Sequence, residues 1–197
     1  SPLDRDTALH NLRTHVKTVV EHFGQKFGDN IISWDVVNEA VDDGKLANPE
    51  DWESTLRESG WFKAIGPDFI YEAFKAAREV IDQNGWKTEL YYNDYNDDNQ
   101  SKMTAITSMV KALNDRYAAE TGQPGKKLID GIGMQAHYTI NTNPENVRAS
   151  IEKIIAIGVK VGITELDIGA GSGGAITEEQ AVKQGQLYAR LFRLYKE

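Results

Sequence analysis

The 197-residue chain contains no cysteine, which excludes disulfides, thiolate metal ligands and cysteine nucleophiles. No apolar run approaches the roughly 18 residues that a membrane-spanning helix requires, and residues 1–6 lack the pattern of a signal peptide. The chain has 22 basic against 30 acidic side chains and no basic cluster that would suit a nucleic acid or an anionic membrane. We therefore expect neither a nucleic-acid partner nor a membrane partner.

Several catalytic and cofactor motifs are also missing. The sequence has no GxSxG elbow, no GxxxxGK[ST] phosphate loop and no GxGxxG dinucleotide fingerprint, so we expect no cofactor. Glu39, His137, Glu165 and Asp167 are legitimate metal-ligand types. Because no HExxH motif or other close-spaced ligand pair accompanies them, a catalytic metal is the less favoured interpretation.

The residues that are present predict one globular α/β domain. With 40% hydrophobic and 26% charged residues, the composition is that of a folded protein with a sizeable core. Apolar periodicity predicts five helices that alternate strictly with four strands, an order that implies a parallel sheet. The predicted helices are 1–22, 68–83, 102–120, 144–157 and 177–197, and the predicted strands are 31–37, 88–92, 128–135 and 159–165.

Each predicted strand ends in polar residues. Functional side chains of alternating parallel folds gather at the C-terminal ends of the strands. One polar strand end is often only a loop, but four in succession indicate a site. The strand ends carry Asn38 and Glu39, Asn93 to Asn96, Gln135 and His137, and Glu165 and Asp167.

Two of these residues, Glu39 and Glu165, suit the cleavage of a glycosidic bond. That reaction needs one carboxyl group to protonate the leaving oxygen and a second to attack or stabilise the anomeric carbon. His137 is a candidate partner for Glu165, with Asp167 orienting its ring, although a lone histidine is more often a hydrogen-bonded core residue. Tyr95 is a credible platform for a sugar ring. For two tryptophans of the long connection 42–67, Trp52 and Trp61, we favour packing.

Four motifs, in their order and spacing, resemble the glycoside hydrolases of family 10, which are endo-β-1,4-xylanases that degrade xylan. The resemblance covers essentially the whole chain, and four motifs in register are more specific than any one of them. They are WDVVNE at 34–39, YNDYN at 92–96, DGIGMQAH at 130–137 and ITELD at 163–167.

The resemblance implies a retaining double displacement in a (β/α)8 barrel. Glu39 matches the general acid/base of the family, Glu165 its nucleophile, and Asn38 the amide that binds a sugar 2-hydroxyl. The two carboxyl groups should then stand about 5–5.5 Å apart. Since adjacent strand residues face opposite ways, the first strand must end or bulge at Asn38 for both neighbours to reach the site.

The remaining site residues also come from the resemblance. His137 matches a histidine bonded to the nucleophile, with Asp167 behind it, and Gln135 lies beside that network. Tyr95 matches an aromatic on the aglycone side of the cleavage point, and Asn93 a polar neighbour of the acid/base. Because the family is usually secreted, we expect a secreted protein.

The chain departs from the family in supplying only four of eight strands, the fourth to the seventh. Residues 1–197 are therefore expected to be a partial catalytic barrel, since such barrels typically need about 250 residues. The strands that carry Glu39 and Glu165 become open edges. We expect activity on xylan or xylo-oligosaccharides only with a complementary barrel segment. The alternatives are a non-catalytic xylan-binding or scaffold fragment, and an enzyme for a related β-1,4-glucan.

Overall fold

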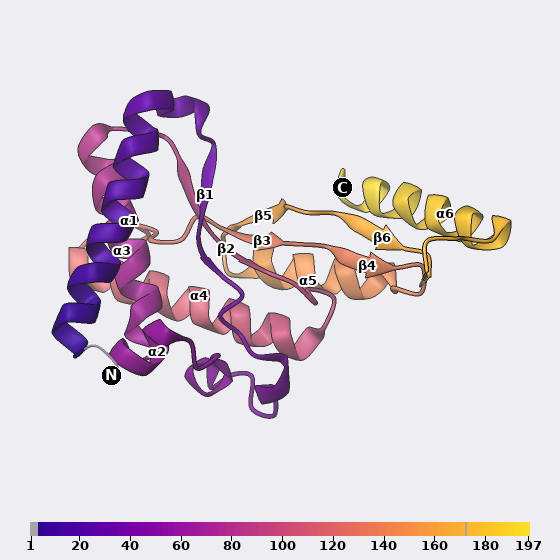
Figure 1. Ribbon diagram of the computed structural model, residues 1–197, viewed down its shortest axis with the longest axis horizontal. Helices are drawn as coiled ribbons and strands as arrows, with labels where there is room; N and C mark the ends of the chain where they lie inside the picture. Colours follow the sequence, from indigo (N-terminus) through magenta and orange to yellow (C-terminus); the bar gives the residue numbers. More distant parts are fainter. Residues whose placement is uncertain (1–3, 172) are drawn as a thin grey trace.

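The computed structural model describes residues 4–171 and 173–197 and confirms a parallel sheet with helices between its strands. The strands of the main sheet follow one another in chain order across it (Figure 1). Each neighbouring pair is parallel, as the alternating sequence pattern predicts. In spatial order they are β1 (Ser33–Asn38), β2 (Glu89–Asp94), β3 (Gly131–Met134) and β5 (Lys160–Ile163).

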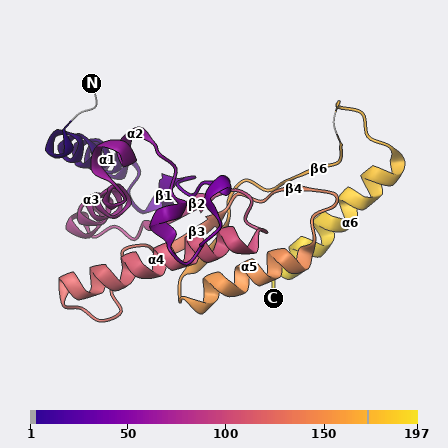
Figure 2. The same ribbon diagram turned by 90° about the horizontal axis from the view of Figure 1, so that it is seen from below.

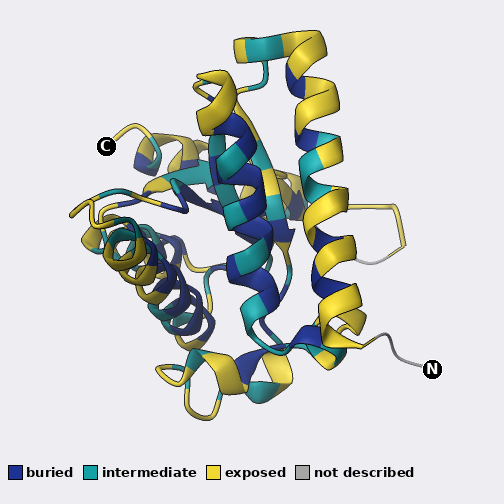
Figure 3. Cartoon of the chain, turned by 90° about the vertical axis from the view of Figure 1, so that its left-hand side faces the viewer, coloured by how far each residue is buried: buried dark blue, intermediate teal, exposed yellow. Residues whose placement is uncertain are grey.

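Helices pack along the sheet and cover its apolar side chains. Helices α1 and α3 lie side by side, and α4 and α5 run side by side along the strands (Figures 1 and 2). Their inner faces are buried and their outer faces exposed (Figure 3). The helices are α1 (Arg5–Phe27), α2 (Gly60–Ile65), α3 (Asp68–Asn84), α4 (Gln100–Thr121), α5 (Pro144–Ala156) and α6 (Glu178–Leu194). No helix in the described ranges is long and apolar enough to cross a membrane.

The first helix differs from its prediction at both ends. Its predicted start at residue 1 lies outside the described residues, and the helix begins after Asp4, whose side chain caps it. It continues past residue 22, its predicted end, through Gly24, and Gly28 caps its C-terminus. A Cβ at position 24 would lie 2.0 Å from the ring of Trp86, so the glycine serves close packing rather than a turn.

The other helix ends follow from their capping residues. Asn143 caps α5, and Thr177 forms a capping box with Gln180 at the start of α6. α3 begins at the predicted residue, Asp68, and Pro67 occupies the cap position before it. The long connection 42–67 is partly helical. It contains α2 and two short 3₁₀ turns, 43–45 and 52–55.

The two strands that lead to the glutamates are the edges of the main sheet, as predicted. Their burial shows the consequence, since Ser33 and Asp35 of β1 are exposed while β2 and β3 are largely buried. β1 is therefore only partly covered by the rest of the chain. Ile32, just before β1, is 80% exposed. An edge strand of this kind offers unpaired backbone groups to a further strand.

The third strand breaks before it reaches His137. Ala136 adopts a left-handed conformation, with φ of 59°, and the chain resumes as β4 (His137–Thr139). β4 pairs in parallel with β6 (Asp167–Gly169), which follows β5 after a similar interruption. This two-stranded ribbon places His137 directly opposite Asp167. It extends away from the main sheet towards α6 (Figure 1).

Candidate active site

Sharp turns end the first three strands and aim their last side chains at one region. Among the described residues, the non-glycine positions with positive φ are Glu39 at 55°, Asn96 at 50° and Ala136 at 59°, each just after a strand. Non-glycine residues seldom adopt this conformation, and such outliers cluster at functional sites. β1 ends at Asn38, which confirms that the strand stops there, and its register shift lies earlier, between Asp35 and Val37.

Side-chain amides connect the two candidate glutamates. Nε2 of Gln135 donates to Oε1 of Glu39 at 3.0 Å and to Oδ1 of Asn38 at 3.2 Å. From the other side, Nδ2 of Asn93 donates to the same Asn38 oxygen at 3.0 Å and to Oε1 of Glu165 at 3.1 Å. One continuous chain of hydrogen bonds therefore runs from Glu39 to Glu165 across the ends of the strands.

The second oxygen of Glu165 faces His137. Nε2 of His137 lies 3.1 Å from Oε2 of Glu165, and its Nδ1 lies 2.7 Å from Oδ2 of Asp167. The hydrogen bond to Asp167, and more weakly the one to Glu165, raises the pKa of His137 above its usual 6.5. Asp167 thus holds the imidazole ring in the orientation that presents Nε2 to Glu165.

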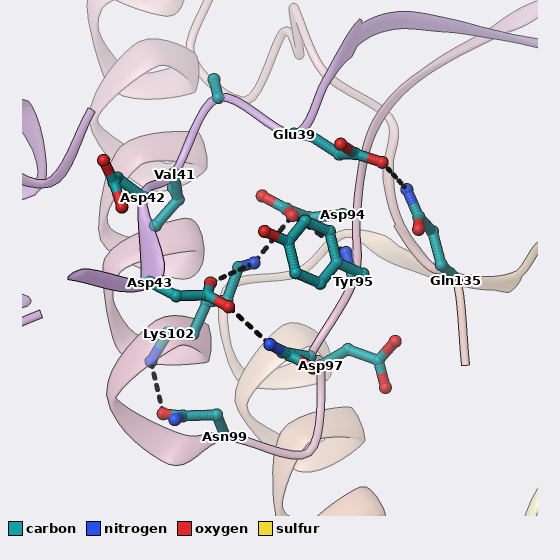
Figure 4. Close-up of polar contacts among 12 residues, drawn as sticks. Glu39, Val41, Asp42, Asp43, Asp94, Tyr95, Asp97, Asn99, Lys102 and Gln135 are labelled. Carbon is teal, nitrogen blue, oxygen red and sulfur yellow. Dashed lines mark hydrogen bonds and ion pairs between the residues drawn. The ribbon is translucent and has the colours of Figure 1, made fainter. Parts of the chain in front are cut away.

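Two amides lie differently from their predicted places. Gln135, expected beside the histidine and the nucleophile, contacts Glu39 instead (Figure 4). The side chain of Asn93, expected beside the acid/base, reaches Glu165, and only its backbone oxygen accepts the N–H of Glu39, at 2.9 Å. Thr164, which was not predicted, fixes the Asn93 amide by donating to its Oδ1 at 2.8 Å.

Tyr95 is half-buried beside the same strand ends, with one ring face occupied. The ammonium of Lys102 lies 3.7 Å from the ring centroid, and the tyrosine hydroxyl accepts a hydrogen bond from Arg57. These contacts fix the ring, so a sugar would have to stack on its other face. No local sequence motif identifies Lys102 or Arg57 as a partner of Tyr95, because the tertiary fold alone brings these side chains to it.

A groove of about 290 Å³ opens beside Glu39, between α1 and the edge strand β1. Trp61 and Arg57 line it, together with apolar residues of α1. Trp52 packs against the hydrophobic core, as predicted. For Trp61 the packing prediction is wrong, because this side chain is 37% exposed and lines the groove.

Asp35, on β1, is a further acidic side chain near the site. Partial desolvation by the surrounding chain, with a smaller contribution from the charge of Glu165, raises the pKa of Asp35. Within residues 4–171 and 173–197, no three His, Cys, Asp or Glu side chains are grouped closely enough to hold a metal ion.

The sequence matches a family model described as glycosyl hydrolase family 10, over residues 2–197. It is 42% identical to an endo-1,4-beta-xylanase A from Thermoanaerobacterium saccharolyticum over 98% of this chain and 15% of that protein. It is also 41% identical to the exoglucanase XynX from Acetivibrio thermocellus, over 99% of this chain and 16% of that one. The chain thus spans less than a fifth of the length of these two relatives.

The crystal structure of the intracellular xylanase TsXylA from Thermoanaerobacterium saccharolyticum superposes on the whole of this chain. The TM-score is 0.80 at 41% identity, and the match covers 54% of that protein's chain. The fold is therefore that of a partial (β/α)8 barrel. Glutamate-to-alanine mutants of TsXylA have been solved with xylotriose and xylotetraose. The description of TsXylA as intracellular contradicts the prediction of secretion, which relied on the family alone.

Proposed function

Because the chain belongs to glycosyl hydrolase family 10, we propose that it is the central part of the catalytic barrel of a retaining endo-1,4-β-xylanase. Residues 1–197 then form one partial domain, which cleaves internal β-1,4 bonds of xylan once the remaining strands are supplied. The observation that carries this proposal is the hydrogen-bonded chain from Glu39 to Glu165. It holds two carboxyl groups at one end of a parallel sheet, where barrel enzymes bind substrate.

In the proposed reaction the two glutamates take different roles. Glu165 attacks the anomeric carbon while Glu39 protonates the departing glycosidic oxygen, which leaves a glycosyl ester on Glu165. Glu39, now a carboxylate, then takes a proton from water, and that water displaces Glu165 with net retention of configuration. Asn93 and His137 contact one oxygen each of the Glu165 carboxylate and so fix its direction of attack.

The neighbouring amide suits a sugar hydroxyl. Oδ1 of Asn38 accepts hydrogen bonds from both Asn93 and Gln135, which turns its Nδ2 group away from these two donors. That group is then available to bind the 2-hydroxyl of the sugar at the cleavage point. Hydrogen bonds to this hydroxyl strengthen in the transition state and contribute several kcal/mol in such enzymes.

We also propose that a complementary barrel segment occupies both edges of the main sheet. On the β1 side, the groove against α1 has an apolar lining that includes Leu12, Val16 and Val36. A further strand placed there would pair with β1 and bury this lining. It would also support Glu39, whose strand now has a neighbour only on the β2 side.

Covalent trapping tests the proposed roles. The material is the completed barrel, meaning residues 1–197 joined to the remaining strands of the domain. A fluorinated xyloside that forms a stable glycosyl ester should label the wild-type protein once, by mass spectrometry, and should leave Glu165→Ala unlabelled. Glu152→Ala, at an exposed position on α5, is the matched control and should be labelled fully. Labelling of Glu165→Ala would show that the nucleophile is another residue.

Two other outcomes would redirect the proposal. Binding of xylo-oligosaccharide without turnover or labelling in the completed barrel would favour a non-catalytic xylan-binding or scaffold fragment. Faster hydrolysis of β-1,4-glucan than of xylan would favour the activity that the name of the Acetivibrio relative suggests. Xylose and glucose differ by one hydroxymethyl group, so comparing kcat/KM on the matched oligosaccharides distinguishes the two substrates.

A further inference from the structure

The turn that carries Glu39 is attached to β2 by three successive backbone N–H groups. The N–H of Glu39 donates to the backbone oxygen of Asn93 at 2.9 Å. The next two, of Ala40 and Val41, donate to the hydroxyl oxygen of Tyr92 at 3.0 and 3.2 Å. A single phenol group therefore accepts both N–H groups that directly follow the candidate acid/base.

The hydroxyl of Tyr92 is itself held by a buried ion pair. It donates to Oδ2 of Asp94 at 2.5 Å, and Tyr92 and Asp94 are 0% and 1% exposed. The other Asp94 oxygen lies 2.9 Å from the ammonium of Lys102, which is fully buried. That ammonium also lies 2.7 Å from Asp43, four residues beyond Glu39 (Figure 4). Tyr92, Asp94 and Lys102 thus contact the chain after Glu39 at two places, which are the N–H groups of Ala40 and Val41 and the carboxylate of Asp43.

The hydrogen bonds of the Tyr92 hydroxyl fix its orientation. With its proton on Asp94, the Tyr92 oxygen presents its lone pairs to the two N–H groups. Burial, together with the charge of Asp94, raises the pKa of Tyr92 well above its usual value of 10, so the phenol keeps that proton. A hydroxyl fixed in this way opposes relaxation of the left-handed Glu39, which by itself favours another backbone conformation.

We propose that Tyr92, oriented by Asp94 and Lys102, is a positioning residue for proton donation by Glu39. It touches neither the substrate nor the reacting atoms, and it acts by fixing the backbone from which the Glu39 side chain extends. Gln135 holds the carboxyl group of Glu39, and Tyr92 holds the N–H groups of the two residues that follow Glu39. The inference rests on the proposed function in assigning proton donation to Glu39.

Tyr92→Phe tests this with two substrates in the completed barrel. A xylobioside with a poor leaving group needs a proton from Glu39, whereas a 2,4-dinitrophenyl xylobioside releases its phenolate without one. We expect Tyr92→Phe to lower kcat/KM about 10- to 100-fold on the first, as a displaced acid would. On the second it should change kcat/KM less than about 3-fold, because attack by Glu165 is unaffected.

Tyr71→Phe is the matched control for loss of a buried tyrosine hydroxyl. Tyr71 is 1% exposed and donates to Glu120 at 2.5 Å, between α3 and α4 and outside the site. Its variant should keep wild-type values on both substrates. If Tyr92→Phe lowers kcat/KM equally on the two substrates, the tyrosine stabilises the fold without positioning the acid, and the proposal is overturned.

Amide hydrogen exchange gives a readout that does not depend on catalysis. In Tyr92→Phe the N–H groups of Ala40 and Val41 should exchange about 5- to 10-fold faster, the ratio that matches the loss of one hydrogen bond. They should be unchanged in Tyr71→Phe. Unchanged exchange in Tyr92→Phe would overturn the inference. If the wild-type barrel is inactive while Tyr92→Phe still speeds the exchange of the Ala40 and Val41 amides, the result would instead count against the proposed function.

Discussion

The fully buried lysine of α4 offers a sharp test of what stabilises the loop after Glu39. Lys102→Met keeps most of the side-chain length and removes its charge. The variant leaves Asp94 without a cation in a place where the carboxylate is 1% exposed, and it frees Asp43 from its ion pair. We expect a lower free energy of unfolding, because an uncompensated buried charge is costly.

The magnitude follows from burial. Removing one partner of a buried ion pair costs about 3–5 kcal/mol. Lys111→Met is the control on the same helix, since Lys111 pairs with Asp115 at 2.5 Å but these side chains are 62% and 65% exposed. That exposed pair should contribute only about 0.3–0.5 kcal/mol. The double variant Lys102→Met with Asp94→Asn should recover about 1–3 kcal/mol, because it removes the unpaired charge.

Urea unfolding of the completed barrel, followed by circular dichroism, measures the free energy of unfolding of each variant. The variants are compared at a common dependence of that free energy on urea concentration. The deficit should also depend on pH. Burial raises the pKa of Asp94 and the charge of Lys102 opposes that rise, so the variant raises it further. Asp94 then takes up a proton as the pH falls through its raised pKa, and the deficit shrinks. A loss no larger than that of Lys111→Met, or one independent of pH, would refute the reasoning.

Two further predictions concern the site and the open sheet. His137 should titrate above 6.5 by NMR, and Asp167→Asn should lower its pKa. Because the pKa of His137 is raised in the folded state, the stability that its ion pair with Asp167 adds is fully present below about pH 6.5. That stability is lost as the pH rises through the folded pKa of His137. An unshifted titration of His137 would contradict the geometry. The 197-residue chain alone should show no xylan turnover and should associate with rising concentration in light scattering. Measurable turnover by a monomer would refute this.

Much of the site was predictable from local patterns. Alternation of helices and strands implies a parallel sheet, and the polar residues after each strand then have to meet at one edge. Glu39, Glu165 and His137 are therefore expected to lie together from their positions after the strands alone. The motif order also places Asp167 behind the histidine, a contact of 2.7 Å in the fold. The capping box at Thr177 is equally local.

Residues whose role depends on long side chains from distant segments were not predictable. A lysine in a helix is usually exposed to solvent, yet Lys102 is fully buried. Tyr92 reads as a core residue of its strand, and only the path of the following loop brings two N–H groups to its hydroxyl. The exchanged places of Gln135 and Asn93 depend on where each strand bends, which periodicity does not encode.

The sequence by itself determined the class of fold, the strand ends that carry the chemistry and the family, because periodicity and motif spacing are local properties. The tertiary structure alone decided how each carboxyl group is held. Hydrogen-bond partners are set by the left-handed turns at Glu39 and Ala136 and by burial among segments about 40 to 100 residues apart. A backbone bend of one residue redirects a side chain, so such contacts follow from the assembled fold.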